Sequence, residues 1–291
     1  MQAILKTRQI LDMIKFEHTI FAMPFALIGV LLASRNLPHG LPSGSTLLWI
    51  VLAMVGARSA AMSFNRLADA DVDAQNPRTA NRHLPAGILT KGQVWLFFIV
   101  AVALFELSAR SLNRLCFLLS PVALLFILGY SYTKRFTWLC HLFLGIATGL
   151  APVGAWVAVR GRLDLVPLLL GAVVMLWIGG FDIIYALQDY DFDCGSALYS
   201  LPKRLGKGRA LIVSRLMHSL MLVVLVLVGV LSGLHALYFL GVGVVAALIC
   251  YEQSLVKPDD LRRVNLAFFT LNGWVSISLF GFVLLDSLLK R

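Results

Sequence analysis

Long apolar runs alternate with short polar gaps along almost the whole of this chain. A helix needs about 20 apolar residues to cross the hydrocarbon core of a bilayer. Nine runs approach that length, and the gaps between them are too short for a separate soluble domain. The pattern predicts one all-α domain over residues 1–291, a polytopic bundle of nine transmembrane helices at about 18–34, 45–66, 93–111, 114–132, 138–158, 164–186, 210–231, 234–252 and 265–287.

Composition supports a membrane protein and excludes other classes. The chain is 59% hydrophobic and 14% charged, against roughly 45–50% and 25% for an average soluble domain. This excess of apolar residues excludes a secreted globule, a fibrous chain and a disordered tail. The net charge of +10 is compatible with nucleic-acid binding. We expect no nucleic-acid partner, however, because the basic residues lie in gaps between apolar runs, as in membrane loops.

The distribution of basic residues predicts the orientation of the chain. Cytoplasmic loops carry an excess of Lys and Arg. With the N-terminus inside, seventeen of the 25 Lys and Arg residues fall on the inner side, seven fall on the outer side, and Arg58 lies within a span. We therefore expect an integral protein of the bacterial inner (plasma) membrane. Its N-terminus and two polar loops, at about 67–92 and 188–209, would be cytoplasmic, and its C-terminus would lie outside.

Nearly half of the 15 acidic residues crowd into two short segments, 65–73 and 182–193. In the first, Asn65, Asp69 and Asp73 are four residues apart, so a helix would place them on one face. Arg58 lies seven residues before Asn65, on the same stripe. Asp71 would point the opposite way, into solvent.

The second segment has a similar spacing. Asp189 and Asp193 are four residues apart, Tyr185 precedes Asp189 by four, and Asp182 precedes it by seven. Both segments end an apolar span at the same membrane face. Oxygen ligands without His or Cys suit Mg²⁺, which proteins usually bind with one or two carboxylates plus substrate phosphates. The alternative is a set of solvated acids at helix ends, but two such stripes in one chain favour a metal site.

Basic side chains near these acids indicate a phosphate ligand. Arg78 and Arg82 follow the first acidic segment, and Lys134 ends the fourth predicted span, four residues after Tyr130. Guanidinium groups match phosphate oxygens, and lysine supplies a point charge. Ordinary membrane-anchoring charges are the alternative, and we adopt that interpretation for Lys203, Arg204, Lys207 and Arg209.

Together these motifs resemble the UbiA superfamily of intramembrane prenyltransferases. Asn65-Arg66…Asp69…Asp73 is similar to its N-(D/R)-x-x-D-x-x-x-D motif. Residues 77–87, Pro-Arg-Thr-Ala-Asn-Arg-His-Leu-Pro-Ala-Gly, resemble the following K/R-T-x-N-R-P-L-P-x-G. The second acidic segment resembles the family's second aspartate motif, and Tyr130…Lys134 resembles its Y-x-x-x-K. The resemblance covers essentially the whole chain.

Within this superfamily the chain resembles the 4-hydroxybenzoate polyprenyltransferase branch, which includes relatives in menaquinone synthesis. Two positions depart from the common pattern, since Arg66 replaces an Asp and His83 replaces a Pro. The implied reaction is Mg²⁺-dependent transfer of a polyprenyl group from its diphosphate to 4-hydroxybenzoate or a related aromatic acid. The implied pathway is ubiquinone or menaquinone biosynthesis, with the lipid bilayer as the surroundings.

The resemblance also implies roles for the site residues. Magnesium would bind Asn65 and the four aspartates Asp69, Asp73, Asp189 and Asp193, with Lys134 and Arg82 on the diphosphate. Arg58 would face the carboxylate of the acceptor, or else pair with an acid such as Asp182. Tyr185 would orient the acceptor, shield the allylic cation or only pack. Three further residues complete the expected substrate-binding set, Arg78, Tyr130 and Asp182.

Two alternatives belong to other classes of function. A cation-coupled secondary transporter would place charges at mid-span or show paired broken helices, whereas these acids cluster at one membrane face. Another UbiA-type acceptor, such as haem, dihydroxynaphthoate or homogentisate, is also compatible. A haem acceptor would call for more histidines than His83 near the site. His18, on the first predicted span, is interpreted as structural.

Overall fold

The computed structural model describes residues 2–14, 19–35, 37 and 40–289. Within these ranges the regular structure is helical, apart from one isolated bridge between Lys257 and Asp260, so the predicted all-α class is confirmed. The elements are α1 (Gln2–Met13), α2 (Thr19–Ser34), α3 (Gly44–Gln75), α4 (Lys91–Leu112), α5 (Arg114–Thr133), α6 (Cys140–Arg160), α7 (Leu165–Ala186), η2 (Leu187–Asp189), α8 (Tyr190–Gly195), α9 (Leu201–Leu205), α10 (Lys207–Leu231), α11 (Ala236–Leu255), η3 (Leu266–Leu271) and α12 (Asn272–Leu288).

Seven of the described helical segments are long and apolar enough to cross a membrane. The remaining two predicted spans coincide with shorter apolar helices, Met23–Ser34 and Asn272–Leu288. The structure therefore supports seven spans by length and composition, and the predicted number of nine is not confirmed. The predicted start of the first span, with His18, lies outside the described residues.

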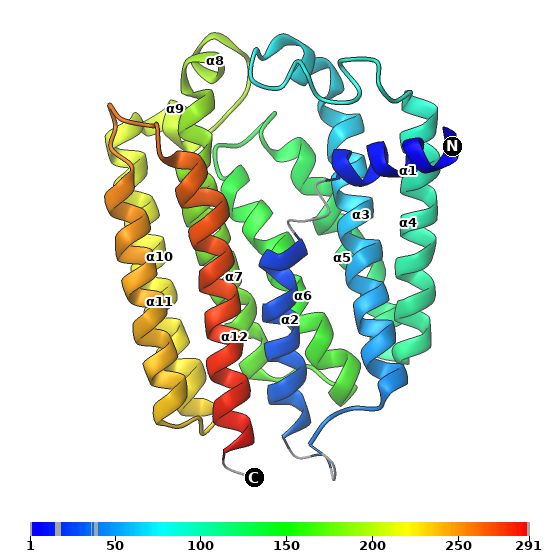
Figure 1. The fold of residues 1–291 in the computed structure, drawn as a ribbon, viewed down its shortest axis with the longest axis vertical. Coiled ribbons are helices and arrows are strands. Elements are labelled where there is room, and N and C mark those ends of the chain that lie inside the picture. The colour runs from blue at the N-terminus through cyan, green and yellow to red at the C-terminus, as the bar shows by residue number, and fades with distance from the viewer. Residues whose placement is uncertain (1, 15–18, 36, 38–39, 290–291) are drawn as a thin grey trace.

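The long helices run side by side, and the short elements gather at one end of the bundle (Figure 1). That end holds α8, α9 and the loop after α3, and α1 lies across the neighbouring ends of α3 and α4. The C-terminus lies at the opposite end. Both acidic segments therefore lie at the same end of the molecule, as their positions in the sequence predict.

Helix α1 was not expected from the sequence pattern. It is amphipathic, with Lys6 and Arg8 exposed, while Met13 packs in an apolar cluster with Leu89 and Val94 of the α4 region. The Lys6 ammonium donates to the carbonyl oxygen of Ile88 at 3.2 Å. A basic amphipathic helix of this kind is typical of segments that lie along a membrane surface.

Helix α3 extends beyond the predicted span and corrects the first predicted loop. Residues 67–75 are helical, so the loop begins at Asn76. Pro77 supplies the reason, because a proline disfavours α conformation in the residue before it. Asn76 is accordingly extended, with φ −89° and ψ 118°. The second predicted loop, 188–209, is also partly helical, since it holds α8, α9 and the start of α10.

Helix α7 lies at the centre of the packing. Its Trp177 is fully buried in a cluster of side chains that also includes α2, α10, α11 and α12. Glycines let α6 approach it closely, because a Cβ added at Gly145 would lie 2.4 Å from the carbonyl oxygen of Met175. Small residues at helix interfaces allow such contact between membrane helices. The helix that carries the second acidic segment is therefore firmly held.

Candidate active site

The acidic stripe on α3 has the orientation that its spacing predicts. The Asp69 side chain is 3% exposed, and Asp73 is buried as well. The Asp71 side chain between them is 91% exposed. Asn65 Nδ2 donates to Asp69 Oδ2 at 3.0 Å. The helix therefore presents Asn65, Asp69 and Asp73 inward and leaves Asp71 in solvent.

The two cations predicted to bind phosphate each contact one of these acids. Lys134 follows directly after α5, and its Nζ donates to Asp69 Oδ2 at 2.7 Å. Arg82 lies in the loop after α3, and its Nη1 lies 2.8 Å from both carboxylate oxygens of Asp73. Because these pairs are partly shielded from solvent, the charges attract more strongly than they would in water.

The loop after α3 also contacts the second acidic segment. Arg78 Nε donates to Asp189 Oδ1 at 2.7 Å, and its Nη1 donates to the hydroxyl of Tyr185 at 3.0 Å. Asn76 Nδ2 donates to the same Asp189 oxygen at 2.9 Å. These contacts place the two acidic segments next to each other, although more than one hundred residues separate them in sequence.

The electrostatic balance at Arg78 follows from these contacts. Burial alone would lower the pKa of the Arg78 guanidinium, but the hydrogen bond and the charge of Asp189 outweigh burial and raise that pKa above its usual value. The guanidinium also lies 5.1 Å from the centre of the Tyr185 ring, within range of a cation–π contact. Arg78 therefore remains a fixed positive charge between the two acidic segments.

The second segment departs from the continuous α-helix that its spacing predicts. α7 ends at Ala186, the turn η2 follows, and α8 begins at Tyr190. Asp189, at the end of η2, faces the loop after α3, whereas Asp193 is buried in α8. Asp191 is exposed. A simple four-residue period does not describe this segment because a tighter turn separates its two helices.

Asp182 has a partner that the sequence did not indicate. Its Oδ2 lies 2.7 Å from Nδ1 of His141, in the first turn of α6. His141 is buried, whereas 23% of the Asp182 side chain remains exposed. The hydrogen bond from Asn76 to Asp189 is a second contact that the sequence did not predict. Both contacts join residues far apart in the chain, so no local spacing pattern could have revealed them.

The oxygen-rich ligand set is compatible with Mg²⁺. The described residues include no group of three His, Cys, Asp or Glu side chains arranged as a metal cluster, because several of the acids are engaged by cations. Asp69 Oδ1 is nevertheless buried without a hydrogen-bond partner among the described residues, and Arg135 lies 3.8 Å away. Hard oxygen donors and a buried carboxylate oxygen that accepts no hydrogen bond from the described residues suit this ion, with substrate phosphates as further ligands.

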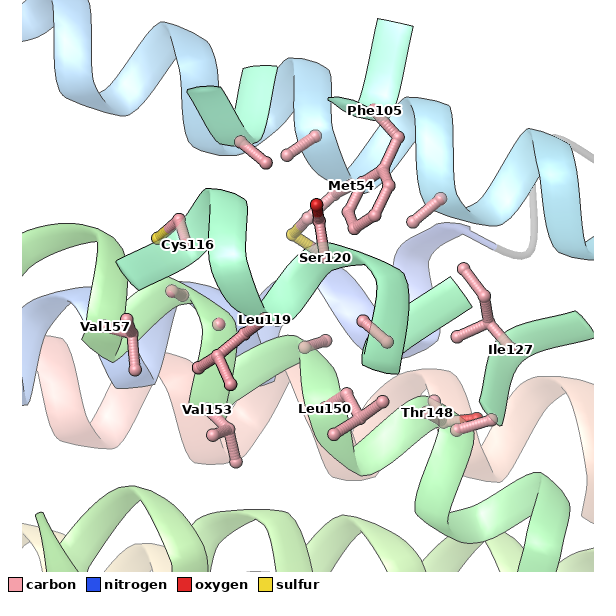
Figure 2. Close-up of a pocket in the computed structure, with 18 of the residues that line it drawn as sticks. Met54, Phe105, Cys116, Leu119, Ser120, Ile127, Thr148, Leu150, Val153 and Val157 are labelled. Atoms are coloured by element: carbon pink, nitrogen blue, oxygen red, sulfur yellow. The ribbon is translucent and has the colours of Figure 1, made fainter. Parts of the chain in front are cut away.

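An apolar cavity of about 420 Å³ lies beside this region, between α3, α4, α5 and α6. Arg58 and Tyr130 are among its few polar lining residues. Figure 2 shows side chains such as Met54, Leu119 and Val153 gathered around it. The lining on α5 reaches from Tyr130 back to Cys116, a distance of about 21 Å at the helical rise. The cavity can therefore hold an extended apolar chain.

Comparison with known proteins gives consistent results. The family model of the UbiA prenyltransferase family matches residues 22–274. The 4-hydroxybenzoate octaprenyltransferase of Aliivibrio fischeri is 31% identical over 251 residues, which cover 85% of this chain and 87% of that protein. The apo structure of a UbiA homologue from Aeropyrum pernix K1 is 35% identical, with a TM-score of 0.84 over 93% of this chain and 98% of that chain.

A more distant structure shows the same fold. A UbiA homologue from Archaeoglobus fulgidus, bound to DMAPP and Mg²⁺, is 19% identical and has a TM-score of 0.70. That comparison covers 96% of this chain and 98% of that chain. The observed helical architecture therefore recurs in a homologue whose structure contains a prenyl diphosphate and magnesium.

Proposed function

Because this chain belongs to the UbiA prenyltransferase family, we propose that it transfers a polyprenyl group from its diphosphate to 4-hydroxybenzoate or a related aromatic acid. The chain is a membrane prenyltransferase, and its relatives include a 4-hydroxybenzoate octaprenyltransferase. The acceptor, the role in ubiquinone or menaquinone biosynthesis and the use of magnesium by this chain are parts of the proposal.

One observation supports the proposal most directly: two acidic segments and three cationic side chains contact one another at one end of the bundle. Arg78 contacts Asp189, Arg82 contacts Asp73, and Lys134 contacts Asp69. A diphosphate with bound Mg²⁺ offers a complement to both sets of charges. The carboxylates would turn to the metal, and the cations would turn to the phosphate oxygens.

The proposed ligands of Mg²⁺ are Asn65, Asp69, Asp73, Asp189 and Asp193, together with diphosphate oxygens. When bound, the ion would neutralise negative charge on the leaving group. Lys134 and Arg82 add preorganised positive charge at the same oxygens, and this stabilisation grows as the diphosphate departs. Arg78 would hold the loop after α3 against α7 and contribute to diphosphate binding.

The apolar cavity is the proposed site for the prenyl chain. Its length along α5 and its aliphatic lining match a polyprenyl tail, and the bundle shields the reacting carbon from water. Arg58, at the cavity wall, is the proposed partner of the acceptor carboxylate, and Tyr130 lines the same wall. Tyr185 and Asp182 would orient the aromatic ring from α7.

The proposed reaction balances without a redox partner. The allylic C–O bond breaks, and its electron pair leaves with the diphosphate. The allylic carbon then bonds to the ring carbon ortho to the acceptor hydroxyl, and the proton from that ring carbon passes to the released diphosphate or to water as aromaticity returns. A site that excludes water favours this attack over hydrolysis of the cation.

We further propose that the chain forms one domain with nine spans in the bacterial inner membrane. Seven long helices and two shorter apolar helices, α2 and α12, support that number. The positive-inside bias supports a cytoplasmic N-terminus, cytoplasmic active-site segments and an outer C-terminus. The metal-binding end would then face the cytoplasm, from which Mg²⁺ can bind and into which the diphosphate product can be released.

An acceptor panel tests the proposed function. Purified protein in detergent or nanodiscs would receive a radiolabelled prenyl diphosphate, Mg²⁺ and one acceptor at a time: 4-hydroxybenzoate, 1,4-dihydroxy-2-naphthoate, homogentisate or haem. We expect labelled product with 4-hydroxybenzoate or another aromatic acid. Transfer to haem alone would contradict the proposed acceptor class, and no transfer to any acceptor would contradict the proposed reaction.

A further inference from the structure

A buried histidine connects two parts of the second acidic segment. His141 lies in the first turn of α6 and is 4% exposed. On one side its Nδ1 lies 2.7 Å from Asp182 Oδ2 on α7. On the other side the backbone nitrogen of Leu201, the first residue of α9, lies 3.3 Å from its Nε2. One imidazole ring therefore joins α6, α7 and α9.

The partners of the ring nitrogens indicate where the ring proton lies. A backbone N–H can only donate, so Nε2 accepts the hydrogen bond from Leu201. Nδ1 then carries the proton and donates to the carboxylate of Asp182. This arrangement occupies one oxygen of Asp182 and leaves the other available to a ligand.

The contact with Leu201 extends to the proposed diphosphate site. Ser200, the preceding residue, is the N-cap of α9, and its side chain lies close to the carboxyl group of Asp193. The backbone nitrogen of Tyr199 donates to the carbonyl oxygen of Lys134 at 2.7 Å. The segment that His141 holds thus contacts both an acid and a cation that we assign to diphosphate binding.

Asp182 lies deeper in the bundle than Asp189. It precedes Asp189 by seven residues, as Arg58 precedes Asn65 on α3. At the helical rise, each is about 10 Å from those residues along its helix. Asp182 lies three residues before Tyr185, whose hydroxyl accepts from Arg78, so both side chains lie on the part of α7 that borders the proposed diphosphate site.

We propose that His141 is a positioning residue for prenyl transfer, an inference that rests on the proposed function. Through Nδ1 it orients Asp182 so that the remaining carboxylate oxygen accepts a hydrogen bond from the acceptor hydroxyl. Through Nε2 it holds residues 199–201, which keep Asp193 and Lys134 around the diphosphate. The two sides of the ring serve different substrates, so they can be separated by substitution.

Two substitutions can each retain one of the two hydrogen bonds that His141 makes. His141→Asn retains an amide N–H near the position of Nδ1, and His141→Gln places an amide oxygen near the position of Nε2. We expect His141→Gln to raise KM for 4-hydroxybenzoate about 10- to 100-fold, the effect of one charge-assisted hydrogen bond, and to leave KM for farnesyl diphosphate within about twofold. We expect the reverse for His141→Asn.

His141→Leu should impair both substrates, and thermal unfolding in detergent measures how much of any loss is due to folding. The proposal is overturned if the leucine variant keeps both KM values and kcat within about twofold of the unsubstituted protein. It is also overturned if the Asn and Gln variants change both constants alike, since ring packing alone would then explain the loss.

A binding measurement separates failure of this proposal from failure of the proposed function. If the unsubstituted protein transfers no prenyl group, the proposed function fails, and stabilisation by magnesium pyrophosphate can still be measured as a shift in Tm. A smaller shift for His141→Asn than for His141→Gln would support the link from His141 to the diphosphate site. Equal shifts for the two variants would overturn it.

Discussion

At the scale of single residues, Asp69 and Asp71 form a matched pair on one helix turn. Asp69 is buried beside Lys134, whereas Asp71 is exposed and lies 3.7 Å from the Lys91 ammonium. We expect Asp69→Ala to lower kcat/KM at least about 100-fold, a typical cost of losing transition-state charge stabilisation. Asp71→Ala should retain most activity, because exposed ion pairs contribute little.

The measurement is prenyl transfer by each variant at equal amounts of folded protein, judged by gel filtration in detergent. An inactive Asp71→Ala protein with an active Asp69→Ala protein would reverse the assignment of the inner face of α3. Asp189→Ala provides a second comparison and should behave like Asp69→Ala.

Lys134 and Arg58 should give different kinetic signatures because they are assigned to different substrates. Lys134→Ala should lower both kcat and kcat/KM for the diphosphate about 10- to 100-fold, since its charge acts on the leaving group. Arg58→Ala should raise KM for an acceptor that bears a carboxylate and spare an acceptor that lacks one. Identical signatures from steady-state kinetics would contradict separate diphosphate and acceptor subsites.

At the scale of elements, the close contact of α6 with α7 should determine stability. A Cβ at Gly145 would lie 2.4 Å from a backbone oxygen of α7, whereas nothing lies within 4 Å of a Cβ at Gly154 on the same helix. We expect Gly145→Ala to destabilise the protein by about 1–3 kcal/mol, the usual cost of overpacking. Thermal unfolding in detergent measures the difference.

Gly154→Ala is the matched control and should leave the protein as stable or slightly more stable, because alanine favours a helix interior over glycine by about 0.5–1 kcal/mol. A Gly154→Ala protein as unstable as Gly145→Ala would show that the glycine at position 145 has no special packing role.

The sequence predicted the positions of the long helices because each apolar run corresponds to a helix. It did not predict α1, which is amphipathic and does not form a long apolar run. Hydropathy also placed the end of the second span at residue 66, although α3 continues to Gln75. Hydropathy does not detect polar helical turns outside the apolar core. Pro77, which follows α3, was therefore the better signal for the end of this helix.

For the site, periodicity predicted the inward face of α3 because a regular helix relates Asn65, Asp69 and Asp73 directly. It failed at the second segment, where the turn η2 interrupts the helix between Ala186 and Tyr190. The contact of His141 with Asp182 depends on tertiary packing of α6 on α7, and a single sequence contains no pattern that reports it.

At the scale of the whole molecule, the orientation in the membrane can be tested with a native cysteine. Cys194 is an exposed free thiol in α8, at the end of the bundle that we assign to the cytoplasm (Figure 1). A membrane-impermeant maleimide should label it in inverted vesicles and not in sealed right-side-out vesicles. Cys194→Ser identifies the signal from this residue, and labelling from the outer side would contradict the predicted topology.

In the proposed function, the two acidic segments hold Mg²⁺ and a prenyl diphosphate for transfer to an aromatic acid. The most direct measurement is radiolabelled prenyl transfer to 4-hydroxybenzoate by the purified protein, with excess Mg²⁺ and then with excess EDTA. We predict transfer with Mg²⁺, partial activity with Mn²⁺ and loss of activity in EDTA, restored by added Mg²⁺. Full turnover in excess EDTA would contradict the claim, because Arg and Lys side chains alone would then suffice for the diphosphate.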